Sequence, residues 1–205
     1  MQDRANLETL PYDILSSVFK SLDRSSLASA CLSSHRINEV ASENLYTSIL
    51  FVISQDDSEA EGPLSAIKRR PSLKRVVQAI LFKFKTGYWG AKLGRKMVII
   101  SDHIRSLPRV RKLEWLSDPR QFSSDTAPIE YFMDILSGMP SVEELVLPTI
   151  FLAPLVPESP FPGTLRHLTL HNTFPLFPVT KWYGSIVPAL ESLIILVGDA
   201  VLVSR

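Results

Sequence analysis

Two histidines lie at a spacing that could hold a metal ion. His167 and His171 are four positions apart, which places two imidazoles on one face when both lie on a helix. Here they flank Leu168-Thr169-Leu170, whose alternation predicts a β-strand, and four residues along a strand separate two side chains by about 13 Å. Neither a cysteine nor a carboxylate cluster is close to them in sequence. The sequence therefore predicts no metal site and no cofactor.

The single cysteine, Cys31, is the other candidate for chemistry. It lies on the apolar face of a predicted short helix, where a cysteine usually behaves as a small buried hydrophobe. A nucleophilic cysteine needs a histidine partner, and a predicted helix break separates Cys31 from His35. Three glycines in the range 87–94 precede Arg95-Lys96, but their spacing fits neither common phosphate-binding motif, so we expect a loop there. No other catalytic signature is present, and we expect a protein that is not an enzyme.

The range 10–49 predicts three short helices. Pro11 suits the first turn of a helix, because that turn does not need its N–H group. A break at Asp23-Arg24-Ser25 follows, and Ser25 is the expected cap of the second helix. The pair Ser33-Ser34 supplies the expected cap of the third. The apolar residues that recur at helical spacing in the first helix are Ile14, Leu15, Val18, Phe19 and Leu22.

These helices carry more apolar side chains than a small core can hide. A unit of this size without disulfides or metal seldom buries enough surface to fold alone, and helices this short are marginal in water. We therefore expect part of the apolar surface to dock in a groove on another protein. The residues that supply this surface are Leu10, Ile14, Leu15, Val18, Phe19, Leu22 and Leu27.

The same range resembles the F-box. The resemblance rests on Leu10-Pro11-x-Asp13-Ile14-Leu15-x-x-Val18-Phe19-x-x-Leu22-Asp23, Ser26-Leu27, Leu32-Ser33-Ser34-His35-Arg36-x-x-x-Val40-Ala41 and Leu45-Tyr46. It implies a module that binds the small Skp-family adaptor of a cullin-RING ubiquitin ligase, while the rest of the chain selects a protein substrate. The residues that it implies for adaptor binding are Leu10, Pro11, Ile14, Leu15, Val18, Phe19, Leu22 and Leu27.

Composition favours a globular intracellular protein. The 205 residues are 45% hydrophobic and 21% charged, with a net charge of +1, which argues against wholesale binding to a polyanion. A single cysteine, no glycosylation sequon and no signal peptide predict a location in the cytoplasm or nucleus. The longest apolar run, Leu193–Val203, is interrupted by Gly198-Asp199, so we expect no membrane-spanning helix.

Charge divides the chain into regions. We expect an F-box-like module at 1–50, an acidic linker at 51–62 and a repeat region at 63–205. A basic stretch at 68–96 lacks any acidic residue, and its lysines and arginines alternate with apolar residues, which favours a solvated surface. The alternative is a nucleic-acid or chromatin-binding face, with Tyr88 and Trp89 available for stacking.

A leucine-rich phrase returns four times in the range 104–195. Its strand-marking leucines are 32, 23 and 25 positions apart, and each copy predicts a short strand preceded by a helix or turn. The copies are Ile104-x-x-Leu107-Pro108-x-Val110-x-x-Leu113-x-Trp115, Leu136-x-x-Met139-Pro140-x-Val142-x-x-Leu145-x-Leu147, Pro162-x-x-Leu165-x-x-Leu168-x-Leu170 and Val187-Pro188-x-Leu190-x-x-Leu193-x-Ile195.

This phrase resembles an irregular leucine-rich repeat. Together with the F-box-like range, it resembles the F-box and leucine-rich-repeat proteins of mushroom-forming fungi. The resemblance implies an α/β fold, in which a three-helix module precedes a solenoid of short parallel strands that alternate with helices and loops. It implies the substrate receptor of a ubiquitin ligase, whose target is not identified by the sequence. A scaffold that uses the F-box outside any ligase is a further alternative.

The last copy of the phrase lacks a polar cap. Residues 193–197 and 201–203 are apolar and are separated by a turn at Gly198-Asp199. A terminal repeat without a cap leaves a hydrophobic edge open to solvent. We therefore expect the repeat array to be truncated at this end.

Overall fold

A computed structural model describes residues 7–53, 61–84, 91–116, 134–148, 161–172, 189–197 and 200–204. The chain forms two compact units, Met1–Ser48 and Ile49–Arg205. The first is helical, and the second is a sheet with helices. Expectations for Tyr88, Trp89 and the range 182–186 lie outside the described residues.

Three helices make the first unit. They are α1 (Tyr12–Lys20), α2 (Arg24–Ala30) and α3 (His35–Tyr46), and a 3₁₀ turn, η1 (Leu7–Thr9), precedes them. The cap expected at Ser25 is instead Asp23, whose carboxylate accepts a hydrogen bond of 2.8 Å from the Ser26 N–H. Aspartate accepts this bond without the rotational freedom of a hydroxyl and adds charge at the positive helix end.

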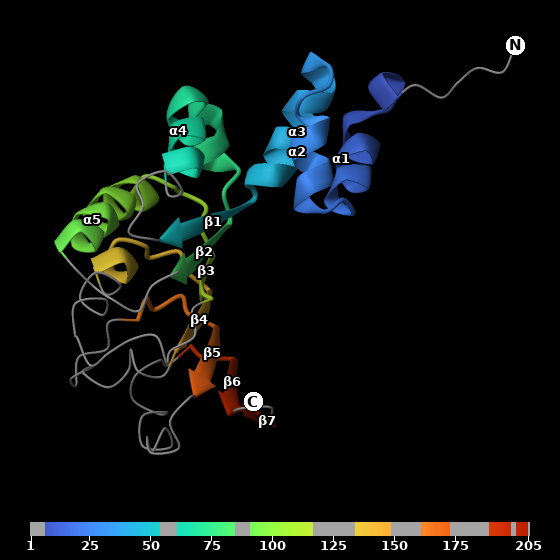
Figure 1. Cartoon of the computed structure of the whole chain (residues 1–205). Helices are drawn as coiled ribbons and strands as arrows, with labels where there is room; N and C mark the ends of the chain where they lie inside the picture. The colour runs from blue at the N-terminus through green and yellow to red at the C-terminus, as the bar shows by residue number, and fades with distance from the viewer. Residues whose placement is uncertain are drawn as a thin grey trace, which may run out of the picture. The chain divides into compact units, whose positions relative to one another are not determined.

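Seven strands form one sheet in the order of the sequence (Figure 1). Strands β2 to β6 are parallel, and the last pair is antiparallel. The strands are β1 (Ser48–Ile53), β2 (Ala79–Phe84), β3 (Lys112–Trp115), β4 (Glu144–Pro148), β5 (His167–Asn172), β6 (Ser192–Val197) and β7 (Ala200–Ser204). A helical unit followed by a mainly parallel sheet is the α/β architecture that the sequence predicts.

The four strand-marking leucines lie in one register. Leu113 pairs with Leu145, Leu145 with Leu168, and Leu168 with Leu193. The leucines therefore lie at equivalent positions although they are 32, 23 and 25 residues apart in sequence. The connecting segments differ in length, while the strands stay in register. A fifth copy, unnoticed in the sequence, is Val77-x-x-Ile80-x-Phe82, whose Ile80 pairs with Leu113.

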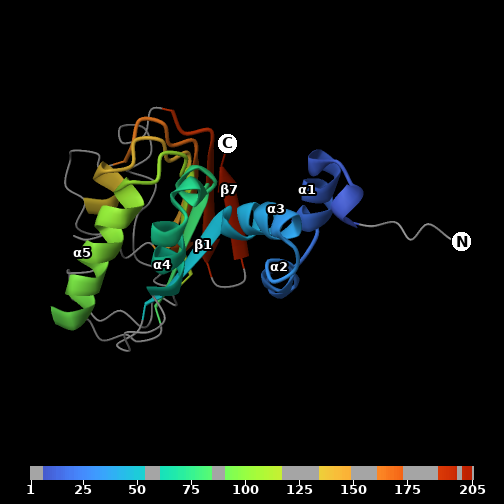
Figure 2. The ribbon, with the colours of Figure 1, turned by 90° about the horizontal axis from the view of Figure 1, so that it is seen from above.

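Helices lie along one face of the sheet. They are α4 (Glu61–Arg69), η2 (Pro71–Arg75), α5 (Ala91–Arg105) and a turn at residues 134–137. Figure 2 shows α5 running beside the strands. The loop expected around residues 87–94 is wrong for its last part, since Ala91–Gly94 begin α5. Met97, Ile100 and Ile104 bury one face of this helix, and that burial outweighs the low helix propensity of Gly94.

Part of the expected linker is regular structure. Residues 51–53 belong to β1 and residues 61–62 to α4, while residues 54–60 lie outside the described part of the chain. Strand β1 forms because Ile49, Phe51 and Ile53 alternate with half-buried residues and are themselves fully buried.

The last two apolar segments of the sequence pair with each other in the structure. Residues 200–204 form β7 and pair antiparallel with β6, from Leu193↔Ser204 to Val197↔Ala200. Only two residues join these strands, a length that permits an antiparallel hairpin but no parallel crossover. Strand β6 is therefore paired on both sides. That further repeats follow the last strand stays a prediction.

An aromatic column fills the core between the first three strands. The ring of Phe82 lies 5.9 Å from that of Phe51 and 5.3 Å from that of Trp115, and Phe84 stacks on Trp115 at 4.6 Å. Trp115 is 2% exposed. Phe82 and Trp115 are register partners on β2 and β3, and Phe51 comes from β1, so the column crosses the sheet, while Phe84 extends it along β2.

Replacing Trp115 by Ala should destabilise the second unit. The change removes the ring contacts with Phe82 and Phe84 and leaves a cavity, which costs about 3–5 kcal/mol of the free energy of unfolding. Urea denaturation followed by circular dichroism measures this loss. Leu116→Ala is the matched control, because the neighbouring Leu116 is 43% exposed, and it should cost well under about 1 kcal/mol. Equal losses in the two variants would contradict the assignment of Trp115 to the core.

Candidate functional site

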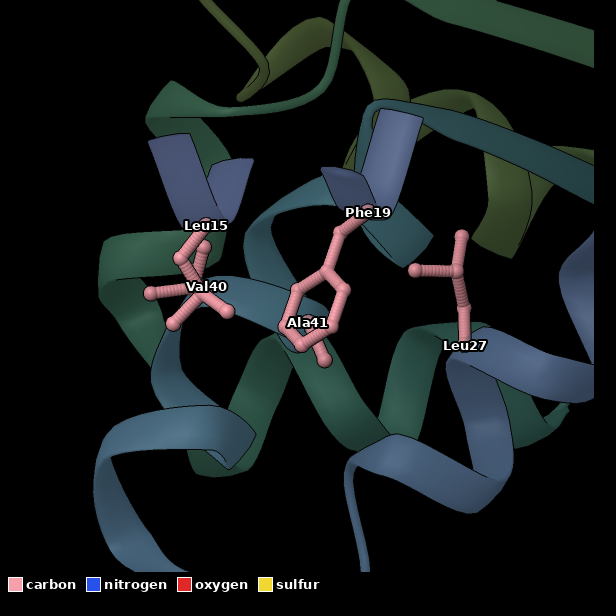
Figure 3. Packing of buried hydrophobic residues seen from close by; sticks show 5 residues of the cluster. All are labelled: Leu15, Phe19, Leu27, Val40 and Ala41. Carbon is pink, nitrogen blue, oxygen red and sulfur yellow. The ribbon is translucent and has the colours of Figure 1, made fainter. Parts of the chain in front are cut away.

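Five side chains make the core of the helical unit (Figure 3). They come from all three helices, and the two from α3 lie next to each other in sequence. Leu22, Ala30, Cys31, Ile37 and Leu45 are partly buried and pack against this core. The core residues are Leu15, Phe19, Leu27, Val40 and Ala41.

Polar contacts fix the helices to one another. Asn44 of α3 donates to the Ser16 hydroxyl of α1 at 3.4 Å, and Tyr12 donates to the Glu43 carboxylate. The hydrogen bond to Glu43 raises the pKa of Tyr12 to about 12, and burial and the nearby negative charges act in the same direction. Arg36 donates to the Leu10 carbonyl just before α1. These contacts hold α1 in one rotational setting against α3.

That setting leaves apolar side chains on the surface of α1. Ile14 and Val18 are 47% and 41% exposed and lie one helical turn apart, so they form a single stripe. Leu32, in the turn between α2 and α3, is 87% exposed, and Leu7 and Tyr12 are about half exposed. An exposed apolar stripe of this kind is suited to insertion into an apolar groove.

The structure divides the eight predicted adaptor-binding residues into two groups. Leu15, Phe19 and Leu27 are buried in the unit's own core. The others are at least partly exposed, although Leu10 and Leu22 less so than the rest. The exposed and partly exposed residues are Leu10, Pro11, Ile14, Val18 and Leu22.

Leu32 and Leu7 were missed as surface candidates in the sequence. Leu32 fits the periodicity of the second helix, but α2 ends at Ala30, and Leu32 therefore leaves the core face. The sequence does contain a local indication that the helix ends here: Leu32 is followed by Ser33-Ser34, and serine pairs favour a helix boundary. Leu7 precedes the first predicted helix and has no periodic partner.

Cys31 and His167, the residues considered above for chemistry, each lie beside a serine hydroxyl. The Cys31 sulfur lies 3.5 Å from the Ser42 hydroxyl, and Nδ1 of His167 lies 2.9 Å from the Ser192 hydroxyl. Within the described ranges, no group of three or more histidine, cysteine or acidic side chains could hold a metal ion. None of the described helices combines the length and hydrophobicity that a membrane span requires.

Cations of the basic stretch lie mainly at the surface. Lys68 and Arg69 end α4 in exposed positions, Arg70 follows the helix and is exposed, and Arg75 and Arg95 are also exposed. Lys74 and Lys96 are partly buried, and Lys83 is exposed. The side chains of Lys85 and Lys92 lie outside the described part of the chain.

A comparison with protein families identifies the helical unit. The F-box-like family matches residues 7–52, a range that contains all three helices and most of β1. The chain carries an F-box-like domain. F-box domains generally bind Skp-family adaptors, and F-box proteins are generally non-catalytic subunits of ubiquitin ligases.

Other comparisons are less informative. No curated protein matches the chain. One similar solved structure is a Bacteroides fragilis protein from a structural genomics programme, with 14% identity and a TM-score of 0.38. The match covers 78% of this chain, which spans about half, 54%, of that protein's length.

The Asp23 cap should make the F-box sensitive to acid. Hydrogen bonds from the Ser26 N–H and hydroxyl lower the pKa of Asp23, so the folded carboxylate binds its proton less readily than the unfolded one. This contribution to stability is present above the unfolded pKa, about 4, and is lost as pH falls through the folded pKa. Asp23→Asn keeps the cap but removes the titration, so its melting temperature should fall less between about pH 5 and pH 2.

Thermal melts of the whole chain, followed by circular dichroism, measure this difference. Ser26→Ala retains the N–H donor and loses the hydroxyl, so it should show an intermediate pH dependence. Identical acid profiles for Asp23→Asn and the unaltered protein would show that the cap contributes nothing to acid sensitivity.

Proposed function

We propose that this protein is the substrate-receptor subunit of a cullin-RING ubiquitin ligase. Its F-box docks on a Skp-family adaptor, and the repeat sheet of the second unit binds a protein target. The observation that carries this proposal is the pair Ile14 and Val18, which remain exposed on α1 of an F-box-like domain. Such a subunit positions its target and catalyses nothing itself, and it acts in the cytoplasm or nucleus.

The exposed stripe supplies the docking energy. Burying an aliphatic side chain of this size contributes about 1.5–3 kcal/mol when the whole side chain leaves water, and Ile14 and Val18 are each about half exposed. The two together therefore contribute about 1–3 kcal/mol on docking. Leu32 adds to this surface because little of it is buried in the free unit.

The predicted site residues divide into two roles. Pro11, Ile14 and Val18 contact the adaptor, with Leu10 and Leu22 at the margin. Leu15, Phe19 and Leu27 act indirectly, because they pack α1 against α2 and α3 and so fix the direction of the exposed stripe. Truncating a core residue removes binding by unfolding the unit, whereas truncating an exposed one leaves the unit folded.

The repeats suit a target-binding role. Five strands share one register, which provides a rigid sheet whose outward positions vary from strand to strand. We assign these repeats to the irregular leucine-rich class on their phrase and their parallel register. A target is then selected by the residues between the repeat leucines, such as Lys112, Glu114 and Thr169.

Serine at both positions of the exposed stripe should weaken adaptor binding without unfolding the protein. Ile14→Ser with Val18→Ser removes the apolar contact, and we expect the dissociation constant of the Skp-family adaptor to rise roughly 10- to 100-fold. Titration calorimetry with the purified adaptor measures this change, and a thermal melt checks that the unit remains folded.

A double variant on the other side of α1 provides the control. Asp13→Ser with Lys20→Ser also places two serines on this helix, in exposed positions roughly 100° or more around it from Ile14. Its affinity for the adaptor should stay within about threefold of the unaltered protein. The proposed function fails if the unaltered chain does not bind the adaptor, or if the two double variants bind equally well.

A further inference from the structure

A polar groove lies on the second unit, at the end of the sheet that is formed by the N-terminal ends of the strands. Its volume is about 640 Å³, within the range of roughly 300–1,000 Å³ that is typical of ligand pockets. It is formed by the segments just before β2, β3, β4 and β5, so four successive repeats contribute to it. Its polar lining residues are Gln78, Arg109, Arg111, Ser141, Glu143 and Thr164.

The lining follows the repeat geometry. Gln78, Arg111 and Glu143 each stand immediately before a strand, and Arg109 and Ser141 each stand two residues earlier. Neighbouring strands lie about 4.8 Å apart, so three equivalent residues span roughly 10 Å. That length accommodates about three residues of an extended chain, which rises about 3.3 Å per residue. The length of the groove therefore matches that of a short extended peptide segment.

The backbone of the groove is already hydrogen-bonded. The Gln78 carbonyl accepts the N–H groups of Arg111 and Lys112 at 2.8 and 3.1 Å, and the Arg111 carbonyl accepts those of Glu143 and Glu144 at 2.8 and 2.9 Å. A ligand is consequently recognised by side chains here, rather than by addition of a strand.

Two arginines give the groove its charge. Arg109 is exposed and makes no ion pair or hydrogen bond with any other residue that the structure describes. The side chain of Arg111 is 68% exposed and lies 3.8 Å from the Glu143 carboxylate, which is a weak pair at that distance and exposure. Both guanidinium groups can therefore bind a carboxylate in the paired geometry that suits them.

We propose that this groove binds an extended acidic segment of a partner protein, with its carboxylates on Arg109 and Arg111. The three charged side chains sum to one positive charge, which suits a peptide with one or two carboxylates better than a polyphosphate backbone. Glu143 lies in the lining and would repel phosphates in a continuous series. The hydroxyl of Ser141 and the amide of Gln78 match peptide groups between the acidic side chains. The inference goes beyond adaptor binding and does not depend on it.

A selection with random decapeptides tests the proposal without assuming a sequence. Peptides displayed on phage are selected on the full-length protein, and their affinities are measured by fluorescence anisotropy. We expect the selected peptides to be enriched in aspartate and glutamate about twofold or more over the input, and to bind roughly tenfold or more weakly to Arg109→Ala with Arg111→Ala.

Two further variants define the specificity of the effect. Arg166→Ala removes an exposed arginine at the position equivalent to Arg111 but outside the groove lining, and it should leave peptide affinity unchanged. Glu143→Gln removes the one carboxylate of the lining, so the acidic peptides should bind about two- to threefold more tightly. Arg109→Glu provides a second loss-of-binding variant if the double alanine variant melts at a lower temperature.

Three results would overturn the proposal. The first is a selection that yields no acidic enrichment, and the second is undiminished peptide binding by both Arg109→Glu and the double alanine variant. The third is a labelled single-stranded decanucleotide that binds more tightly than the peptides, through the same two arginines. Adaptor affinity is measured in parallel and should not change in the groove variants, so failure of the groove and failure of adaptor binding give different results.

Discussion

One carbonyl oxygen in each repeat sets the register of the whole sheet. The residue just before a strand accepts two consecutive N–H groups from the next repeat, and this contact recurs from Gln78 through Arg111, Glu143 and Arg166. Its distances lie between 2.8 and 3.1 Å in all four copies. A slip of one residue would turn every buried leucine to the other face of the sheet, so this repeated contact and the leucine column depend on each other. Everything on the surface of the sheet inherits its position from this arrangement.

The helical unit is limited by the small size of its hydrophobic core. Five side chains from three short helices are fully enclosed, and several other apolar residues are only partly covered. The apolar face of α1 is wider than the core can cover, so the unit encloses Leu15 and Phe19 and leaves Ile14 and Val18 partly exposed. The contacts of Tyr12 with Glu43 and of Arg36 with the Leu10 carbonyl hold α1 in this rotational setting. The surplus stripe is therefore a consequence of how the unit folds.

Much of this architecture can be predicted from the sequence. The leucine phrase identifies four strands and their register, because burial of alternate residues in equivalent copies leaves one consistent alignment. The copy at Ile80 escapes notice because Phe82 takes the place of a leucine and an aromatic column replaces aliphatic packing. The start of α5 escapes notice because Gly94 and the basic residues beside it are typical of loops, and only the packed strands reveal the buried face. Likewise, periodicity identifies the apolar residues of α1 but cannot state which of them the α3 contacts turn inward.

The surface of the second unit shows how a repeat can be both uniform and specific. The main chain before each strand must be the same in every copy, since the same carbonyl fixes the register. The side chains there are not constrained in this way, and they alternate in charge: Arg111 lies near Glu143, and Arg166 pairs with Glu191. Arg166 and Glu191 are in direct contact, whereas Arg111 and Glu143 are 3.8 Å apart. Arg109, in the same repeat as Arg111, pairs with none of the residues that the structure describes. Among these positions before the strands, positive charge is therefore least compensated just before β3, within the lining of the groove. The same backbone contact thus recurs before each strand, while the side chains of Arg109 and Arg111 distinguish the groove from the other repeats.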